Sequence, residues 1–157
     1  MDTRAAQSKL TLLAVSLLFL PFLQANNISF NYCDKNANYV VKVDGLIISP
    51  YPVVGGKTAT FNISASTGQA ISGGTAVIDV FYFGMHVDHE PYDFCEETSC
   101  PIPVGEFLIS HHPEFPAISP PGSYLVEMRL LSSDNSQELT CISYNFSLIS
   151  ESLVSDS

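Results

Sequence analysis

Apolar and polar residues alternate one by one along most of this chain, in short runs separated by Gly, Pro, Asn and Ser clusters. The run from Ala59 to Ala65 is the clearest, with apolar side chains at every second position. A β-strand points successive side chains to opposite faces, so this alternation predicts strands with one buried face. The pattern recurs about seven or eight times, and no segment reads as a convincing amphipathic helix. We therefore expect an all-β, immunoglobulin-like sandwich of two sheets, although no Trp is present to complete the immunoglobulin signature.

The alternation also predicts which side chains face the interior. In one run, Val41, Val43 and Ile47 are expected to point inward, opposite Lys42 and Asp44. The run from 76 to 83 is apolar on both faces, which indicates a central strand or one covered on its second side.

Four cysteines, Cys33, Cys95, Cys100 and Cys141, allow three pairings into two disulfides. Cys95 and Cys100 are close enough to close a tight loop in an oxidising compartment. The strand phasing puts Cys33 and Cys141 on outward faces, each near one end of its strand. This placement favours the nested pairs Cys33–Cys141 and Cys95–Cys100, in which the small ring shapes a loop and adds little global stability.

Residues 1–25 have the pattern of a signal peptide. Arg4 and Lys9 precede an apolar stretch, 10–23, which is shorter than the roughly 20 residues of a membrane span and contains Pro21. An uncleaved anchor is the alternative interpretation. We expect residues 26–149 to form one domain and residues 150–157 to be a polar, disordered C-terminal tail.

Three glycosylation sequons, at Asn27, Asn62 and Asn145, fit the secretory route. Each asparagine falls on the outward face of its predicted strand, where a glycan can be tolerated. We expect the protein to enter the secretory pathway, with an extracellular or vacuolar destination.

The charge balance limits the classes of partner. The whole chain has 16 acidic and 6 basic residues. Without Asp2, Arg4 and Lys9 of the leader, 15 and 4 remain, a net charge of −11. This balance argues against binding of nucleic acid, or of an anionic membrane through bulk electrostatics.

The sequence indicates neither catalysis nor a metal site. His86, Asp88 and His89 offer mixed ligands, but strict alternation puts His86 and Asp88 on one strand face and His89 on the other. No serine lies in a nucleophile elbow, and the cysteines fit structural disulfides. We therefore predict a protein that is not an enzyme and that has no metal or cofactor.

Three motifs together carry a family resemblance. They are the Cys-x4-Cys-Pro-Ile-x-x-Gly of residues 95–105, the outer cysteine pair, and the Pro-Pro-Gly-x-Tyr of residues 120–124. In these motifs the chain resembles the ML lipid-recognition domain family, which includes the Niemann-Pick type sterol carriers, and it looks closest to the small secreted plant members. The resemblance covers about residues 27 to 149.

Patterning by itself favours a filled core, because protein interiors are close-packed. The resemblance implies a hollow one, because the two sheets of ML domains part at one end and hold a sterol, an acyl chain or a phospholipid tail. Twelve residues are then expected to line an apolar pocket between the sheets: Phe61, Ile63, Val80, Tyr82, Phe107, Phe115, Ile118, Tyr124, Val126, Ile142, Tyr144 and Phe146.

The pocket mouth of the family matches two loops here, 83–92 and 113–121. Carboxylates cluster around the first of them, which predicts that anionic head groups are disfavoured unless nearby histidines gain charge as the pH falls toward 5. The histidines expected at this mouth are His86, His89 and His111. Tyr51 and Val54 stand where the sterol-carrier branch has a third disulfide, which argues against dedicated sterol specificity while leaving lipid binding in place.

These observations predict a secreted lipid-binding or lipid-transfer protein that holds a sterol or phospholipid between its sheets. We expect a monomer that makes transient contact with a membrane or receptor and does not bind nucleic acid. The alternative is a non-enzymatic recognition module with a filled core, which binds a protein partner through its surface loops.

Overall fold

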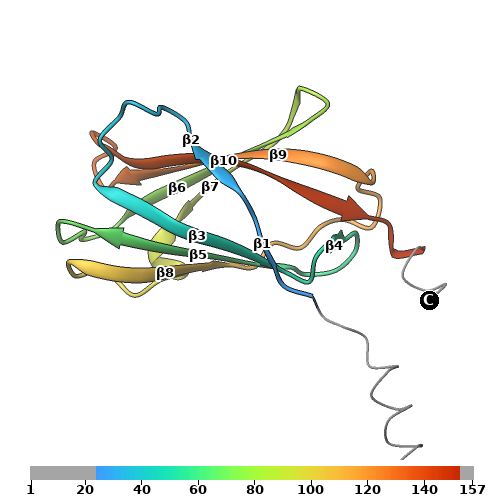
Figure 1. Ribbon diagram of the computed structural model, residues 1–157, viewed down its shortest axis with the longest axis horizontal. Helices are drawn as coiled ribbons and strands as arrows, with labels where there is room; N and C mark the ends of the chain where they lie inside the picture. The colour runs from blue at the N-terminus through green and yellow to red at the C-terminus, as the bar shows by residue number, and fades with distance from the viewer. Residues whose placement is uncertain (1–23, 153–157) are drawn as a thin grey trace, which may run out of the picture.

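In the computed structural model, two β-sheets pack face to face (Figure 1), and the structure describes residues 24–152. The four-stranded sheet has the order β1-β3-β5-β8, and the second sheet has the order β2-β10-β9-β6-β7, with β4 paired in parallel to β10. The elements are β1 (Asn26–Asn27), β2 (Phe30–Tyr32), β3 (Val41–Ser49), β4 (Val53–Val54), β5 (Thr60–Thr67), β6 (Gly74–Tyr82), β7 (Met85–Asp93), the 3₁₀ turn η1 (Phe94–Glu96), β8 (Gly105–His111), β9 (Gly122–Ser132) and β10 (Glu138–Ile149).

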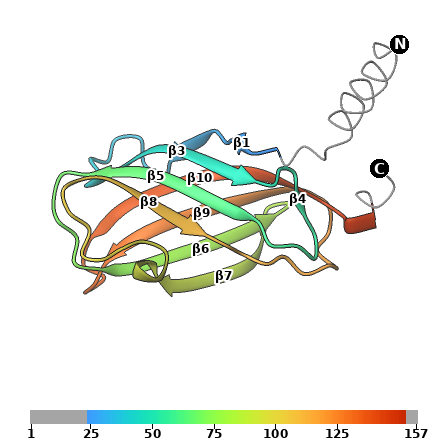
Figure 2. The same ribbon diagram turned by 90° about the horizontal axis from the view of Figure 1, so that it is seen from below.

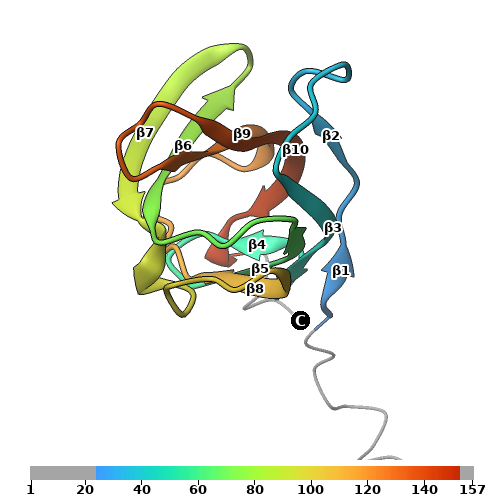
Figure 3. The same ribbon diagram turned by 90° about the vertical axis from the view of Figure 1, so that its left-hand side faces the viewer.

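The predicted all-β sandwich is confirmed. Seen along the strands in Figure 3, the sheets form two separate layers, and Figure 2 shows β5 and β8 lying over β10, β9 and β6. The core lies between the layers, where alternate side chains of both sheets are buried, as the period of two requires. No helix within residues 24–152 is long and apolar enough to cross a membrane. The predicted signal peptide lies outside the described residues except for its last two positions.

A β-bulge in β3 corrects one predicted face. The pairing with β5 shifts between Val43 and Gly45, so one extra residue lies in β3 at this point. Val41 and Val43 face inward as predicted, but beyond the bulge Leu46 and Ile48 are buried and Ile47 is 39% exposed. The prediction that Ile47 faces inward is therefore wrong, because a single added residue moves every later side chain to the other face.

The polar segment expected as a loop before the small disulfide is instead an edge strand. β7 pairs with β6 along its whole length, and the two are joined by the two-residue turn Phe83-Gly84. Both turn residues have positive φ, 49° and 76°, as a type I′ hairpin turn requires. The pairing shifts between Val80 and Phe81, which leaves Val87 as the extra residue of a bulge.

The two disulfides have the predicted nested pairing. Cys33 and Cys141 join β10 to the end of β2, with Cα atoms 5.4 Å apart, and Cys95 and Cys100 close the loop that follows β7, with Cα atoms 5.5 Å apart. β10 ends at Ile149. The tail that follows was expected to be disordered, but its first residues are ordered. A helical turn lies at 151–152, and Glu151 forms an ion pair with Lys57, with Nζ and Oε1 3.2 Å apart.

Candidate functional site

A cavity of about 190 Å³ lies between the two sheets near the edge formed by β7. Its apolar walls come from β5, β6, β9 and β10, and its outer edge comes from β7 and the loop between β8 and β9. The lining residues are Phe61, Ile78, Val80, Asp88, Glu90, His111, Pro113, Glu114, Phe115, Pro116, Val126, Tyr144 and Phe146.

Aromatic rings form the inner wall of the cavity. Phe61 meets Phe146 edge to face, with ring centroids 5.6 Å apart, and Phe115 lies 5.5 Å from Phe146. Tyr144 lies 6.3 Å from Phe61. Burial raises the pKa of Tyr144, so its phenol stays neutral. These rings present a rigid, uncharged surface, which suits contact with hydrocarbon.

An apolar groove of about 380 Å³ adjoins the cavity toward the β6–β7 hairpin. The groove and the cavity share Val80, Asp88, Phe115 and Pro116, so their walls are continuous. The other lining residues of the groove are Tyr82, Val87, Ser119, Pro120 and Tyr124.

Two stacked tyrosines fix the far wall of this groove. The rings of Tyr82 and Tyr124 lie 4.7 Å apart. Tyr124 donates to the carbonyl of Pro120 at 2.6 Å, and Tyr82 donates to that of Pro121 at 2.9 Å. Burial, with a smaller effect of neighbouring Tyr82, raises the pKa of Tyr124. Both hydroxyls are thereby bonded to the backbone, and the Tyr124 ring is held between Tyr82 and Phe146, on which it also stacks with centroids 5.4 Å apart.

The loop that closes the outer side, 112–121, is tied to the turn before β5. Gly56 N–H donates to the carbonyl of Phe115 at 2.7 Å, and Ala59 N–H donates to that of Pro113 at 3.1 Å. These backbone bonds hold Phe115 against the aromatic wall, so the loop forms a fixed side of the cavity.

The rim of the cavity is acidic. Asp88 and Glu90 lie opposite Val80 and Ile78 in the β6–β7 ladder and therefore face the space between the sheets. Beside them lies an open hollow of about 550 Å³, lined by Glu90, Glu96, Glu97, Ser110, His111, His112, Pro113 and Glu114.

His111 connects the cavity to this hollow. Its Nδ1 lies 2.5 Å from Glu97 Oε1, and its ring stacks on Tyr92 with centroids 5.2 Å apart. Burial, followed by the charge of Glu97, raises the pKa of Tyr92. The hydroxyl of Tyr92 and the Oε2 atom of Glu97 are both buried without a protein partner.

The structure brings eight of the twelve predicted pocket residues to the cavity or the groove: Phe61, Val80, Tyr82, Phe115, Tyr124, Val126, Tyr144 and Phe146. Ile63 and Ile142 fill the closed part of the core instead, and Phe107 is half-buried on β8 away from both hollows. Ile118 is 91% exposed and lines neither.

Several lining residues were not on the predicted list. Ile78 lies two residues before Val80, so the alternation places it on the same inward face, and it could have been included for that reason. His111, the last residue of β8, lines the cavity, and it is the one of the three histidines expected at the mouth that does so. Pro113, Glu114 and Pro116 belong to the loop 113–121, which the family resemblance placed at the mouth but whose polar, proline-rich sequence did not single them out.

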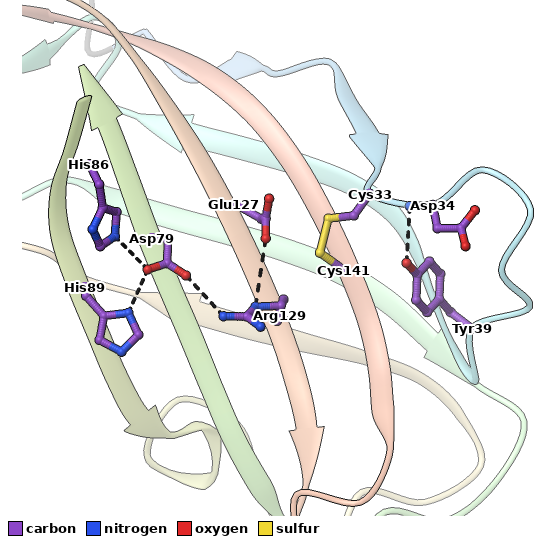
Figure 4. A network of polar contacts seen from close by, with 9 residues as sticks. All are labelled: Cys33, Asp34, Tyr39, Asp79, His86, His89, Glu127, Arg129 and Cys141. Carbon is purple, nitrogen blue, oxygen red and sulfur yellow. Dashed lines mark hydrogen bonds and ion pairs between the residues drawn. A yellow bond between two sulfur atoms is a disulfide. The ribbon is translucent and has the colours of Figure 1, made fainter. Parts of the chain in front are cut away.

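His86 and His89 do not lie at this mouth, contrary to the prediction. The bulge at Val87 brings both onto the outer face of their sheet, beside Asp79 (Figure 4). Burial acts to raise the pKa of Asp79, but hydrogen bonds with His89, His86 and Arg129 outweigh it and lower the pKa. Strict alternation predicted that His86 and His89 lie on opposite faces of their strand. This prediction is wrong, because the bulge at Val87 brings both to the same face.

The sequon asparagines lie on outer faces. Asn27 and Asn145 are exposed, and Asn62 is partly covered, since Ser110 Oγ lies 2.6 Å from its Oδ1 atom. Whether any of them carries a glycan stays a prediction.

Comparison with known proteins agrees with this geometry. The family model described as ML domain matches residues 27–148. The chain is 29% identical over 140 residues to a putative phosphatidylglycerol/phosphatidylinositol transfer protein of Dictyostelium discoideum, with 85% of this chain and 94% of that protein aligned. It is 33% identical over 116 residues to the phosphatidylglycerol/phosphatidylinositol transfer protein of Candida albicans, covering 70% of this chain and 60% of that one.

A solved structure has the same arrangement of sheets. The Niemann-Pick type C2 protein from Japanese carpenter ant superposes with a TM-score of 0.60 at 13% identity, covering 77% of this chain and 99% of that one. At this identity the likeness concerns the fold. The family match spans nearly the whole sandwich, from β1 to the end of β10. The chain therefore belongs to the ML domain family.

Proposed function

We propose that this protein binds one lipid and carries its apolar part in the cavity and groove between the two sheets. One observation carries the proposal: the interior is hollow beside β7, and the hollow is walled by aromatic rings and opens at one edge. The recognition module with a filled core, kept as an alternative above, requires an interior without such a space.

The size of the space supports a lipid tail as the ligand. Small-molecule sites in proteins have volumes of about 300–1,000 Å³. The cavity of about 190 Å³ is below this range, but the cavity and the groove together fall within it. Burial of apolar ligand surface, at roughly 25 cal/mol per Å², supplies the driving force, less the cost of ordering the ligand.

We favour a phospholipid over a sterol. Both relatives described above are named for transfer of phosphatidylglycerol and phosphatidylinositol. Asp88, Glu90 and Glu114 repel a phosphate at the rim, but carboxylates accept hydrogen bonds from the hydroxyls of glycerol or inositol. A hydroxyl-rich head group therefore fits this rim better than a bare phosphate.

We assign the protein no enzymatic activity and expect a monomer that contacts a membrane or receptor transiently. Two disulfides support passage through the secretory pathway, with an extracellular or vacuolar destination.

Lipid extraction and mass spectrometry of the protein purified from a secreting host test the proposal. We expect close to one phospholipid per chain. Val80→Trp places a large side chain where the cavity and groove meet and should remove the lipid, whereas Leu125→Trp, on the outer face of β9, should retain it. A wild-type protein that carries no lipid, and takes none up from vesicles, contradicts lipid binding.

A further inference from the structure

A polar cluster on the outer face of the six-stranded sheet lines neither the cavity nor the groove. It consists of Asp79 from β6, His86 and His89 from β7, and Arg129 and Glu127 from β9 (Figure 4). The cavity is lined by the opposite face of the same strands, through Ile78, Val80, Asp88 and Glu90. The cluster therefore needs an explanation of its own.

The bulge at Val87 builds this cluster. Asp79 pairs with His89, and Phe81 pairs with His86, so both histidines lie opposite outward-facing residues of β6. In a regular strand, residues three positions apart point to opposite faces. The extra residue cancels this reversal and aims both imidazoles at one carboxylate. Phe81 packs beside the His86 ring, with centroids 5.1 Å apart.

The two imidazoles converge on a single oxygen atom of Asp79. His86 Nε2 lies 2.8 Å from Asp79 Oδ1, and His89 Nδ1 lies 2.6 Å from the same atom. One ligand atom from each residue falls within 4.8 Å of the others. Tetrahedral ligation at 2.0–2.2 Å requires donor atoms about 3.3–3.6 Å apart, so small side-chain rotations that draw the two imidazoles back from Asp79 are enough to admit an ion among them.

The surroundings suit a cation with open coordination positions. Asp79 is 9% exposed, and Arg129 Nη2 holds its second oxygen, Oδ2, at 3.3 Å. The carboxylates of Asp79 and Glu127 outweigh the one guanidinium, which leaves a net charge of −1 to receive a dication. The side chains of His86 and His89 are about half exposed, so an ion and its remaining water ligands can reach them.

We propose that Asp79, His86 and His89 form a binding site for a divalent transition-metal ion of the Zn²⁺ or Cu²⁺ type. Two imidazoles and a carboxylate are donors that these borderline ions prefer, whereas Ca²⁺ and Mg²⁺ prefer oxygen ligands throughout. The bound ion cross-links edge strand β7 to β6. Within 24–152, the other set of three potential ligand atoms that lie within 4.8 Å of one another comes from Cys33, Glu127 and Cys141, whose sulfurs are joined in a disulfide.

Calorimetric titration of tag-free, chelator-stripped protein with Zn²⁺ tests the site directly. We expect one equivalent to bind. His86→Gln and His89→Gln should each weaken binding by about tenfold or more, and the double variant should abolish it. His112→Gln, which removes an exposed histidine from the other sheet's edge, should bind as wild type does. Because all three substituted rings are exposed, folding of the variants is expected to survive.

Two outcomes overturn the proposal: no saturable Zn²⁺ or Cu²⁺ binding to the wild type, or equal binding by the double variant. Hydrogen exchange gives a local readout, since saturating Zn²⁺ should slow exchange of the β7 amides and leave β3 unchanged. Unchanged β7 amides also contradict the cross-link. None of these measurements depends on lipid, so the metal site can fail while the proposed lipid function holds.

Discussion

Phe61 of β5 and Phe146 of β10 meet edge to face across the sandwich, with their ring planes at 90° and centroids 5.6 Å apart. Both side chains are almost fully buried, and both also line the cavity. The same contact therefore joins the two sheets and forms the wall against which a lipid is proposed to pack.

Phe61→Ala should lower the free energy of unfolding by about 3–5 kcal/mol, because it removes buried apolar area and several ring contacts. Urea denaturation monitored by circular dichroism measures the change. Leu108→Ala, on the exposed face of β8, is the control and should cost less than about 1 kcal/mol. A loss for Phe61→Ala as small as that of the control would show that this pair does not hold the sheets together.

The two disulfides should differ in their effect on stability. In the chain-entropy model, closing the 108-residue separation of Cys33 and Cys141 contributes about 5 kcal/mol, and closing the 5-residue separation of Cys95 and Cys100 contributes about 2 kcal/mol. Paired Ser substitutions at each bridge, compared by denaturant unfolding, measure both. We expect Ser substitution of Cys33 and Cys141 to reduce the secreted yield strongly. A larger loss of stability on substitution of Cys95 and Cys100 would contradict this order.

Asp134 should titrate well below an ordinary aspartate. Hydrogen bonds from Ser136 and Ser132 lower its pKa to about 2, since they favour the charged form in the turn between β9 and β10. The unfolded value is about 3.9. The folded pKa is the lower one, so this group stabilises the fold above about pH 4, and the contribution disappears as the pH falls toward 2.

NMR titration of the Asp134 carboxyl measures this shift. Ser136→Ala should raise its pKa toward the unfolded value, because it removes the first of the stabilising hydrogen bonds. Ser133→Ala is a matched control in the same turn, since Ser133 donates none of the bonds named above. A wild-type pKa near 3.9 contradicts the hydrogen-bonded turn.

The sequence predicted the architecture because most strands bury one face and leave the other in water. That pattern was enough to place the inward aromatics Phe61, Tyr144 and Phe146 and to pair the cysteines. It failed at the two bulges, near Asp44 and at Val87, because a bulge is set by the register with the neighbouring strand. Ile47 and the two histidines of β7 were misassigned for this reason.

The candidate site was predictable only in part. Strand β7 is polar and exposed along nearly its whole length, so it carries no alternation that would identify it as a strand. Which inward side chains border a cavity depends on how far the two sheets separate, and no local pattern encodes that distance. Ile63 and Ile142 point to the same inward face as the lining residues of their strands, yet they fill the closed core. Ile118 was assigned to the pocket as an apolar residue of the loop that matches the mouth of the family, but in the structure it is 91% exposed.

Exposed apolar side chains at the tip of the β6–β7 hairpin, beyond the end of the groove, predict how lipid is transferred. Phe83 is 83% exposed and Met85 62% exposed at the tip of the β6–β7 hairpin, which projects beyond the sandwich in Figure 1. Phe83 follows the groove residue Tyr82 and its ring lies against it, with centroids 4.6 Å apart, and Met85 lies two positions before the groove residue Val87. Full burial of one large apolar side chain is worth about 1.5–3 kcal/mol, so these two can hold the groove against a bilayer for lipid exchange. The acidic chain, with a net charge of −10, needs such apolar contact because it is not drawn to anionic surfaces.

Phe83→Ser/Met85→Ser should slow phospholipid transfer between neutral phosphatidylcholine vesicles by roughly tenfold or more, because the loss of apolar contact weakens docking. The amount of lipid bound at equilibrium should stay unchanged, since neither side chain lines the cavity or the groove. Val104→Ser, which removes an exposed apolar side chain just before β8 begins, is the matched control and should transfer lipid at the wild-type rate. If the hairpin variant also transfers at that rate, lipid leaves the groove without contact between this tip and the membrane. If it instead loses its bound lipid, the hairpin contributes to the pocket itself.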